Sequence, residues 1–471
     1  FFHFFRLSPL PFPFSDYIYI FGLQPTNTNH PAMSLPPLKA LALLVLLFLL
    51  DFSASFTISN NPSAFHSQPA LVGKVSQRTR HREMSMVSWK GRTAYSETLP
   101  FSARFAVLGG GSFGLAAASV LARKKFPVTV LVRKEEIAKH INEKHMHPVY
   151  LQNVTLPENI RATTDAREAL SDATFIIHSI PVQHSRRFLE EHRNLFPRSA
   201  PILSLSKGIE TGTLSTMDEI LRQTLGQDGS YAYMSGPSFA REMALEQATA
   251  VVFASRDEQL AEDLALAFSG PSFKCFTTTD VIGLEIGGAV KNVVALAAGM
   301  CEGLDLGTNA KAGLVTRGCA EMRRLATLMG GRASTVSGLS GVGDAFATCF
   351  GPLSRNRSFG YRLGRGESVQ DILGSMNEVS EGVQTSYALV DLIRRKDHSY
   401  RIDLKYPILM GVNRILEGEI TPEEGLQNLM AMPLRAESFQ FLEDRAVVGG
   451  GAGVGGGGRK EWIRGWDTQQ P

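Results

Sequence analysis

Short aliphatic runs alternate with helix-like spacings over the middle of the chain. The runs are FAVL (105–108), VTVLV (128–132), FIIHSI (175–180) and PILSLSKG (201–208), and the segment LAAASVLARKK between the first two has a helical pattern. Strands that alternate with helices pair in parallel, and the helices cover both faces of the sheet. We therefore expect an α/β domain over residues 101–282, built on a doubly wound parallel sheet.

The pattern changes at about Gly283. From 283 to 445, stretches rich in Ala, Leu and Met follow one another without comparable β-branched runs, which predicts an all-α C-terminal domain. The Gly-rich residues near the end cannot bury a core, so we expect a flexible tail at 446–471. The chain of 471 residues is long enough for two domains, because single cores stop growing at about 250 to 300 residues.

The first hundred residues have the composition of a targeting leader. The apolar run ALALLVLLFLL at 40–50 is shorter than the about 20 residues of a spanning helix and fits the core of a signal peptide. Residues 53–98 are rich in Ser, Arg and His and poor in acids, as transit peptides are. We expect residues 1–100 to be a largely disordered leader to a plastid. A mitochondrial or cytosolic destination, secretion and a membrane anchor remain alternatives.

Charge and cysteine content narrow the range of partners. The formal net charge is +3, and residues 1–100 carry +4, so the rest of the chain lacks the basic excess of nucleic-acid binders. The four cysteines lie far apart without a CxxC pair, which indicates a reducing compartment and neither a zinc site nor a disulfide framework. We expect a small-molecule ligand, no nucleic acid, no metal, and a mature protein that does not span a membrane.

Three glycines form a GxGxxG motif directly after the run FAVL. Gly109 allows a tight turn, Gly111 lets a pyrophosphate approach the backbone, and Gly114 lets the following helix pack on the strand. The N-terminal N–H groups of that helix would face the phosphates. The motif predicts a Rossmann-type dinucleotide site, and a purely structural Gly-rich turn is the alternative.

The end of the second run bears on the choice of dinucleotide. An acidic residue there would bind a free ribose 2′-hydroxyl, but the chain has Arg133 and Lys134, and two cations suit a 2′-phosphate. Glu135 and Glu136 follow and weaken this preference. We expect NAD or NADP as cofactor, with NADPH favoured.

The segment 283–300 places a lysine in apolar surroundings. Apart from Glu285, Lys291 and Asn292, its residues are apolar or small. Partial desolvation lowers the pKa of a lysine and lets it exchange a proton near neutrality. The alternative is a lysine whose stem packs while its ammonium reaches water.

Six blocks occur in order along the chain. They are GGGSFG (109–114), LSLSKGIE (203–210), SGPSFAREM (235–243), EIGGAVKNVVALAAG (285–299), GLSGVGDAFATCFGPLSRNRSFG (338–360) and VSEGVQT (379–385). Together they resemble the NAD(P)-dependent glycerol-3-phosphate dehydrogenases. The resemblance implies interconversion of dihydroxyacetone phosphate and sn-glycerol 3-phosphate, which supplies the backbone of glycerolipids. We also expect a homodimer.

The resemblance implies a role for each matching residue. Lys291 matches the family's proton-donating lysine, Lys207 a second lysine that contacts substrate and cofactor, and Asp344 a polar group at the reacting hydroxyl. The implied substrate contacts are Lys207, Gly236, Ser238, Asn292, Asp344, Thr348, Ser354, Arg355 and Asn356, of which Arg355 and Asn356 clasp the phosphate. The implied cofactor contacts are Gly109, Gly110, Gly111, Ser112, Phe113, Gly114, Arg133, Lys207, Ala240, Arg355, Val379 and Glu381.

Two other interpretations stay open. One is another two-domain dehydrogenase of a small acid, such as a sugar acid or a ketopantoate-like acid, which would need an anion clamp different from SRNR at 354–357. The other is a protein that senses the dinucleotide without catalysis, and such a protein has no need of Lys207, Lys291 and Asp344 together.

Overall fold

A computed structural model gives the fold and describes residues 103–376, 380–399 and 401–432. These residues all belong to one compact unit. The expected leader at 1–100 and the expected tail at 446–471 lie outside the described residues.

Eight strands form one sheet in the order β3-β2-β1-β4-β5-β6-β7-β8. Their bounds are β1 Phe105–Leu108, β2 Val128–Leu131, β3 Ile160–Thr163, β4 Phe175–His178, β5 Ile202–Ser204, β6 Tyr231–Ser235, β7 Thr249–Ser255 and β8 Phe273–Thr278. Strands β1 to β6 run parallel in register, with Leu108 beside both Leu131 and His178. The expected doubly wound parallel sheet is confirmed for this part of the chain.

Strand β7 departs from the expectation because it pairs antiparallel with β6, and β8 then pairs parallel with β7. The link between β6 and β7 contains only the five-residue helix α8 (Ala240–Ala244). So short a helix does not carry the chain back along the sheet as a crossover helix does, and β7 therefore runs in the opposite direction. The sequence pattern identifies β1, β2, β4 and β5 and does not identify the other four strands.

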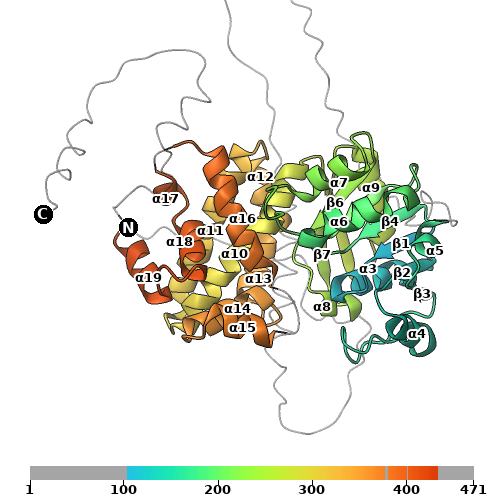
Figure 1. The fold of residues 1–471 in the computed structure, drawn as a ribbon, viewed down its shortest axis with the longest axis horizontal. Helices are drawn as coiled ribbons and strands as arrows, with labels where there is room; N and C mark the ends of the chain where they lie inside the picture. The colour runs from blue at the N-terminus through green and yellow to red at the C-terminus, as the bar shows by residue number, and fades with distance from the viewer. Residues whose placement is uncertain (1–102, 377–379, 400, 433–471) are drawn as a thin grey trace, which may run out of the picture. The chain divides into compact units, whose positions relative to one another are not determined.

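Helices cover both faces of the sheet, as Figure 1 shows. Their bounds are α3 Ser112–Arg123, α4 Glu135–Lys144, α5 Ala166–Leu170, α6 Val182–His192, α7 Met217–Leu225 and α9 Glu258–Phe268. One buried cluster joins the sheet to α3, α4, α8 and α9, and a second joins it to α5, α6 and α7. The alternation of inward-facing residues along each strand divides the core in this way.

Every described element after β8 is a helix, so the expected all-α region is confirmed. The bounds are α10 Val281–Gly303, α11 Gly307–Leu328, α12 Ala333–Val336, α13 Asp344–Phe350, α14 Arg355–Gly364, α15 Val369–Ser375, α16 Glu381–Lys396, α17 Ile402–Lys405, α18 Pro407–Leu416 and α19 Pro422–Met430. A π-helical turn at Leu339–Gly343 precedes α13. The expected domain boundary at 282/283 falls inside the first turn of α10, and the division into domains stays a prediction.

Helix α10 is the central element of this region and is buried along almost its whole length. Among the described residues it is the one helix that is long and apolar enough to cross a membrane, yet 94% of its most apolar window lies inside the protein. Its apolar character is therefore explained by packing against α11, α13, α14 and α16.

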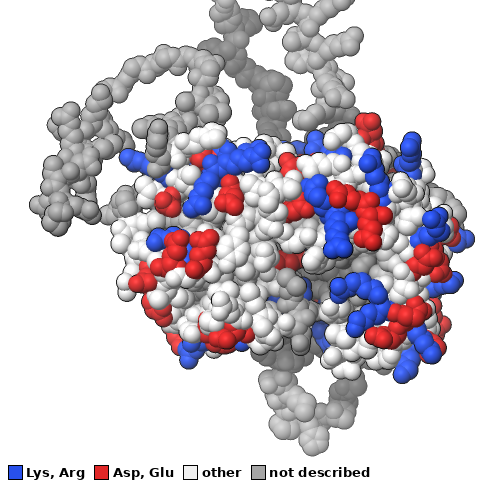
Figure 2. Space-filling model, in the orientation of Figure 1, with Lys and Arg blue, Asp and Glu red and all other residues white. Residues whose placement is uncertain are grey.

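Charged side chains of both signs are interspersed on the face that Figure 2 shows. Several charged side chains of the described residues form exposed pairs, such as Arg104 with Asp172 at 2.6 Å and Arg414 with Glu419 at 3.0 Å. Such pairs contribute little to stability individually, about 0 to 1 kcal/mol.

Helices α10 and α14 cross with their backbones in direct contact. A Cβ atom at Gly299 would lie 2.1 Å from the carbonyl oxygen of Arg357, and one at Gly360 would lie 2.0 Å from the carbonyl oxygen of Leu296. Any larger residue at either position would push the helices apart. These glycines therefore fix the distance between the two helices.

We predict that Gly299→Ala lowers the free energy of unfolding by about 1 to 3 kcal/mol, the usual cost of overpacking a core. Gly411 in α18 is the control, since a Cβ there meets nothing within 4 Å. Gly411→Ala should leave stability unchanged or raise it by about 0.5 to 1 kcal/mol. Urea unfolding of both variants measures the difference, and equal stabilities would contradict the account of the helix crossing.

Candidate active site

Several candidate residues follow the carboxyl ends of parallel strands. Gly109 follows β1, Lys207 lies three residues beyond β5, and Gly236 follows β6. Because these strands are parallel, their carboxyl ends meet at one edge of the sheet, where open α/β sheets bind ligands. The strand order reverses between β1 and β4, at the glycine motif.

The glycine loop fits a dinucleotide pyrophosphate. Gly109 has a φ of +112°, and a Cβ there would lie 2.8 Å from the carbonyl oxygen of Ser179. A Cβ at Gly114 would lie 2.1 Å from the carbonyl oxygen of Gly109, whereas one at Gly111 meets nothing within 4 Å. Gly111 is also the N-cap of the 12-residue helix α3, without a side-chain cap. Space for a ligand and a helix N-terminus therefore coincide at Gly111.

Four predicted residues meet in a buried polar cluster. The Nζ atom of Lys291 donates to Asp344 Oδ1 and to Thr348 Oγ1, both at 2.8 Å. The Nζ atom of Lys207 donates to the other oxygen, Asp344 Oδ2, at 2.6 Å. One carboxylate thus holds two lysines, which come from α10 and from the loop after β5. Asp344 is 3% exposed and Lys291 8%.

The surroundings favour proton exchange at Lys291. Burial lowers the pKa of Lys291, and the cation of Lys207 lowers it further, while Asp344 acts in the opposite direction. Burial would raise the pKa of Asp344, but the two lysines outweigh it and hold the pKa below its usual value. An ionised carboxylate between two lysines, one of them with a lowered pKa, can support a general acid and base.

The residues that the resemblance assigns to the substrate phosphate begin α14. Ser354 is the N-cap of this helix, and its Oγ accepts from the N–H of Arg357 at 3.2 Å. The Arg355 side chain is exposed, whereas Asn356 is buried. Asn356 Nδ2 donates to Asn292 Oδ1 at 2.9 Å, and Asn356 Oδ1 accepts from Ser380 Oγ at 2.7 Å. Among the described residues only one of the two Asn356 amide hydrogens has a partner, and the substrate contact of Asn356 stays a prediction.

Glu381 begins α16 and is electrostatically coupled to the lysine cluster. Burial raises its pKa, while the cations of Arg355, Lys291 and Lys207 act against this rise. The sequence resemblance assigns Glu381 to the cofactor, and this role also stays a prediction. Val379, assigned with it, lies outside the described residues.

The other candidates are distributed around the same edge of the sheet. Lys207 Nζ lies 5.8 Å from the ring centre of Phe113 in α3, which links the lysine cluster to the glycine loop. Ser238 Oγ donates to the carbonyl oxygen of Gly236 at 2.8 Å, and Ala240 begins α8. Arg133 follows β2 and is exposed, apart from the lysine cluster. Their ligand contacts stay predictions.

Two carboxylates, Glu285 and Glu210, were not among the predicted site residues. Glu285 Oε1 accepts from the N–H of Asp218 at 2.9 Å, and burial together with Asp218 raises the pKa of Glu285 to about 8. Glu285 lines a small pocket with Lys207 and Gly288. Glu210 is buried beside Arg186, as described below. Glu285 lies in the apolar segment that contains Lys291, and Glu210 lies three residues after Lys207; these positions were the available signal.

Comparisons with known proteins agree with this geometry. Residues 104–261 match the family model described as NAD-dependent glycerol-3-phosphate dehydrogenase N-terminus, and residues 280–427 match the C-terminus of the same family. A chloroplastic glycerol-3-phosphate dehydrogenase [NAD(+)] of Oryza sativa subsp. japonica is 44% identical over 349 residues, which cover 74% of this chain and 78% of the relative.

Bacterial proteins match over nearly their whole length. A glycerol-3-phosphate dehydrogenase [NAD(P)+] of Desulfovibrio desulfuricans is 44% identical over 332 residues, covering 70% of this chain and 98% of the relative. The crystal structure of glycerol-3-phosphate dehydrogenase from Coxiella burnetii superposes with a TM-score of 0.66 at 33% identity, covering 71% of this chain and all of that one.

Proposed function

The chain belongs to the NAD(P)-dependent glycerol-3-phosphate dehydrogenase family, and from this premise we propose that it interconverts dihydroxyacetone phosphate and sn-glycerol 3-phosphate. The observation that carries the proposal is the pair of lysines held by the buried Asp344 carboxylate, at the carboxyl edge of a sheet with a glycine loop. Ketone reduction needs a hydride, a proton at the carbonyl oxygen and an anchor that aligns the substrate.

Lys291 is the proposed proton donor. In reduction, its ammonium gives a proton to the substrate oxygen as negative charge develops there, and in oxidation its amine takes the proton back. The lowered pKa of Lys291 eases both the release and the return of this proton. Lys207 and Asp344 hold the donor and help to stabilise the oxygen.

The N-terminus of α14 is the proposed phosphate anchor. The planar guanidinium of Arg355 suits two parallel hydrogen bonds to a phosphate, and the remaining amide hydrogen of Asn356 suits a third. The helix N-terminus adds a favourable dipole. The glycine contact between α10 and α14 supports this role, because it sets the distance from the anchor to Lys291.

The residues 109–114 would hold the nicotinamide dinucleotide, which supplies or accepts the hydride when bound. We propose NADPH as the preferred cofactor. Arg133 is exposed at the end of β2, while Lys134 pairs with Glu136 at 3.6 Å and Thr164 donates to Glu135 at 2.7 Å. The two acids thus have partners of their own, and Arg133 is the cation best placed for a 2′-phosphate.

We further propose the wider setting of the enzyme. Residues 101–282 would form the dinucleotide domain and 283–445 the substrate domain. The leader 1–100 would direct the enzyme to a plastid, as the chloroplastic rice relative suggests by analogy. There the enzyme would provide the glycerol backbone of lipids. The mature enzyme would be a homodimer that does not span a membrane. Exposed Phe346 and Phe350 on α13 offer apolar surface of the kind that subunits bury. Light scattering and a fluorescent fusion of residues 33–100 test the dimer and the compartment.

We predict that Arg355→Lys lowers kcat/KM for dihydroxyacetone phosphate at least about 10-fold, because it keeps the charge but loses the fork, and a charge-assisted contact contributes about 1.5 to 3 kcal/mol. Free dihydroxyacetone should be a very poor substrate and should be far less affected. Arg365→Lys at the other end of α14 is the control and should change neither value. Equal losses with both substrates, or ready reduction of dihydroxyacetone by the wild type, would contradict the proposed function.

We predict that Arg133→Asp shifts the preference from NADPH towards NADH, because it replaces a partner of the 2′-phosphate with an acceptor for the ribose hydroxyl. Steady-state assays with both cofactors give the ratio of kcat/KM values. Lys139→Asp on the exposed side of α4 serves as the charge-matched control. An unchanged ratio in Arg133→Asp would show that Arg133 does not contact the adenosine ribose.

A further inference from the structure

The loop between β5 and α7, residues 205–216, connects the sheet to the helical region. Lys207 reaches Asp344 of α13, and Gly208 follows with a φ of +143°. Ile209 is fully buried in the core of the helical region. Glu210 is 7% exposed and lies against α6, on the sheet side of the loop. Successive residues of this loop are therefore held by different elements.

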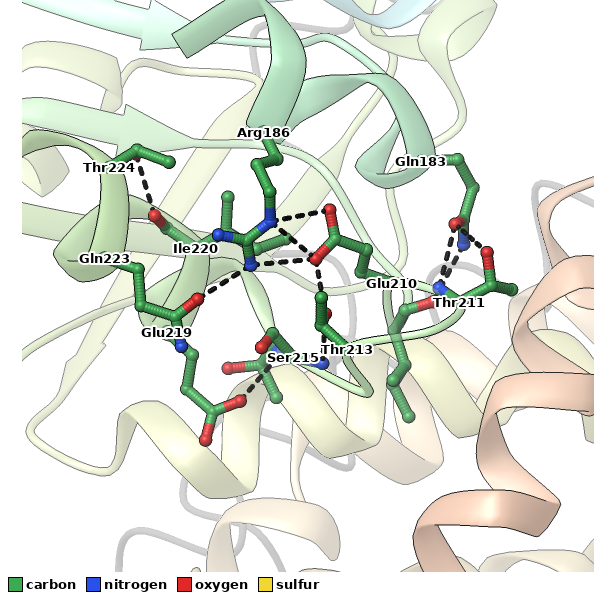
Figure 3. A network of polar contacts seen from close by, with 12 residues as sticks. Gln183, Arg186, Glu210, Thr211, Thr213, Ser215, Glu219, Ile220, Gln223 and Thr224 are labelled. Carbon is green, nitrogen blue, oxygen red and sulfur yellow. Dashed lines mark hydrogen bonds and ion pairs between the residues drawn. The ribbon is translucent and has the colours of Figure 1, made fainter. Parts of the chain in front are cut away.

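Arg186 of α6 grips the Glu210 carboxylate with a fork. Its Nε atom lies 3.1 and 2.9 Å from the two carboxylate oxygens, and one terminal nitrogen lies 2.8 Å from Oε2 (Figure 3). The same terminal nitrogen donates to Gln223 Oε1 of α7 at 2.7 Å, and Thr213 Oγ1 also donates to the Glu210 carboxylate. Because several N–H groups of Arg186 are bound at once, the ion pair fixes the orientation of the Glu210 carboxylate as well as its distance from α6.

Gln183, one turn earlier on α6, holds the backbone on both sides of Glu210. Its Nε2 donates to the carbonyl oxygen of Ile209 at 2.8 Å, and its Oε1 accepts from the N–H and the hydroxyl of Thr211, both at 2.9 Å (Figure 3). Helix α6 begins at Val182, three residues after Ser179, and the carbonyl oxygen of Ser179 packs against Gly109. The helix that binds the loop 205–216 therefore begins next to a residue that contacts the glycine turn.

We propose, on the basis of the function proposed above, that Arg186, Glu210 and Gln183 position Lys207 against Asp344 for the reaction. None of the three bonds to the lysine cluster in the structure, so they act through the loop. The nearest of them, Glu210, is three residues from Lys207. An ammonium on a flexible four-carbon stem keeps a fixed place only when its backbone is fixed.

The position of Lys207 affects the proton affinity of Lys291. The charged groups that act on Lys291 are Asp344 of α13, Lys207 of the loop and Glu381 of α16, and the thiol of Cys349 on α13 lies near it. Lys207 lowers the pKa of Lys291 directly and also binds one oxygen of Asp344. If Lys207 moves away, Lys291 no longer feels its positive charge and no longer shares the Asp344 carboxylate with it. The pKa of Lys291 therefore rises.

The test compares Arg186→Met with Arg187→Met, which changes the exposed neighbour on the same helix. We expect Arg186→Met to lower kcat/KM for dihydroxyacetone phosphate about 10-fold at neutral pH, through misplacement of Lys207. The alkaline limb of its pH profile should move up by at least about 0.5 pH unit, because protonated Lys291 persists to higher pH. The dinucleotide affinity of Arg186→Met should match that of the wild type, and so should the pH profile of Arg187→Met.

An Arg186→Met profile whose limb coincides with that of the wild type would overturn the proposal, whatever the loss of stability. If Arg186→Met fails to fold, Glu210→Gln takes its place, because it preserves the shape of the partner of Arg186. Glu210→Gln should move the alkaline limb in the same direction, and an unmoved limb in this variant would also overturn the proposal. In a Lys207→Met background, Arg186→Met should cause little further loss, and additive losses would overturn the proposal. Absence of wild-type turnover would instead remove the proposed function itself.

Discussion

The Asp344 carboxylate binds two lysine ammonium groups where water is largely excluded, and the rest of the site is arranged around this contact. Two cations and one anion leave a net positive charge in a medium of low dielectric, which is costly unless each group keeps a close partner. Lys291, Lys207 and Asp344 come from α10, from the loop after β5 and from α13, so the contact forms only when three separate elements are in place. Loss of Asp344 would leave like charges facing each other.

Helix α10 provides the frame for this contact. Its small residues let neighbouring backbones approach. A Cβ at Gly287 would lie 2.9 Å from the carbonyl oxygen of Ser340, which belongs to the π-helical turn before Asp344, and one at Gly288 would lie 3.6 Å from the Lys207 stem. Further along, Gly299 meets α14. One helix thus sets the positions of the proposed proton donor, the carboxylate and the proposed phosphate anchor. This explains why an enzyme core contains a helix apolar enough to resemble a membrane span.

Much of this arrangement could be predicted from local sequence, and the remainder depends on contacts that local sequence does not contain. The strand-glycine-helix pattern at 105–123 and the apolar helix around Lys291 each carry their own signal. The Lys207–Asp344 bond joins residues 137 positions apart, and the Arg186–Glu210 pair rests on the packing of α6 against the loop. Strand β7 reverses direction because α8 is short, which aliphatic runs do not indicate. The resemblance assigns Asn356 to the substrate, whereas its bonds to Asn292 and Ser380 became visible only in three dimensions.

The central claim is that the Asp344 carboxylate sets the proton affinity of Lys291. The most direct measurement is the pH dependence of kcat/KM for glycerol 3-phosphate oxidation in the wild type and in Asp344→Asn. In the proposed mechanism oxidation requires unprotonated Lys291, so activity should rise with pH through the pKa of this group. Removing the carboxylate leaves burial and Lys207 to disfavour the ammonium, and the acidic limb should move to lower pH by at least about one unit. A limb that stays in place or moves to higher pH would contradict the account.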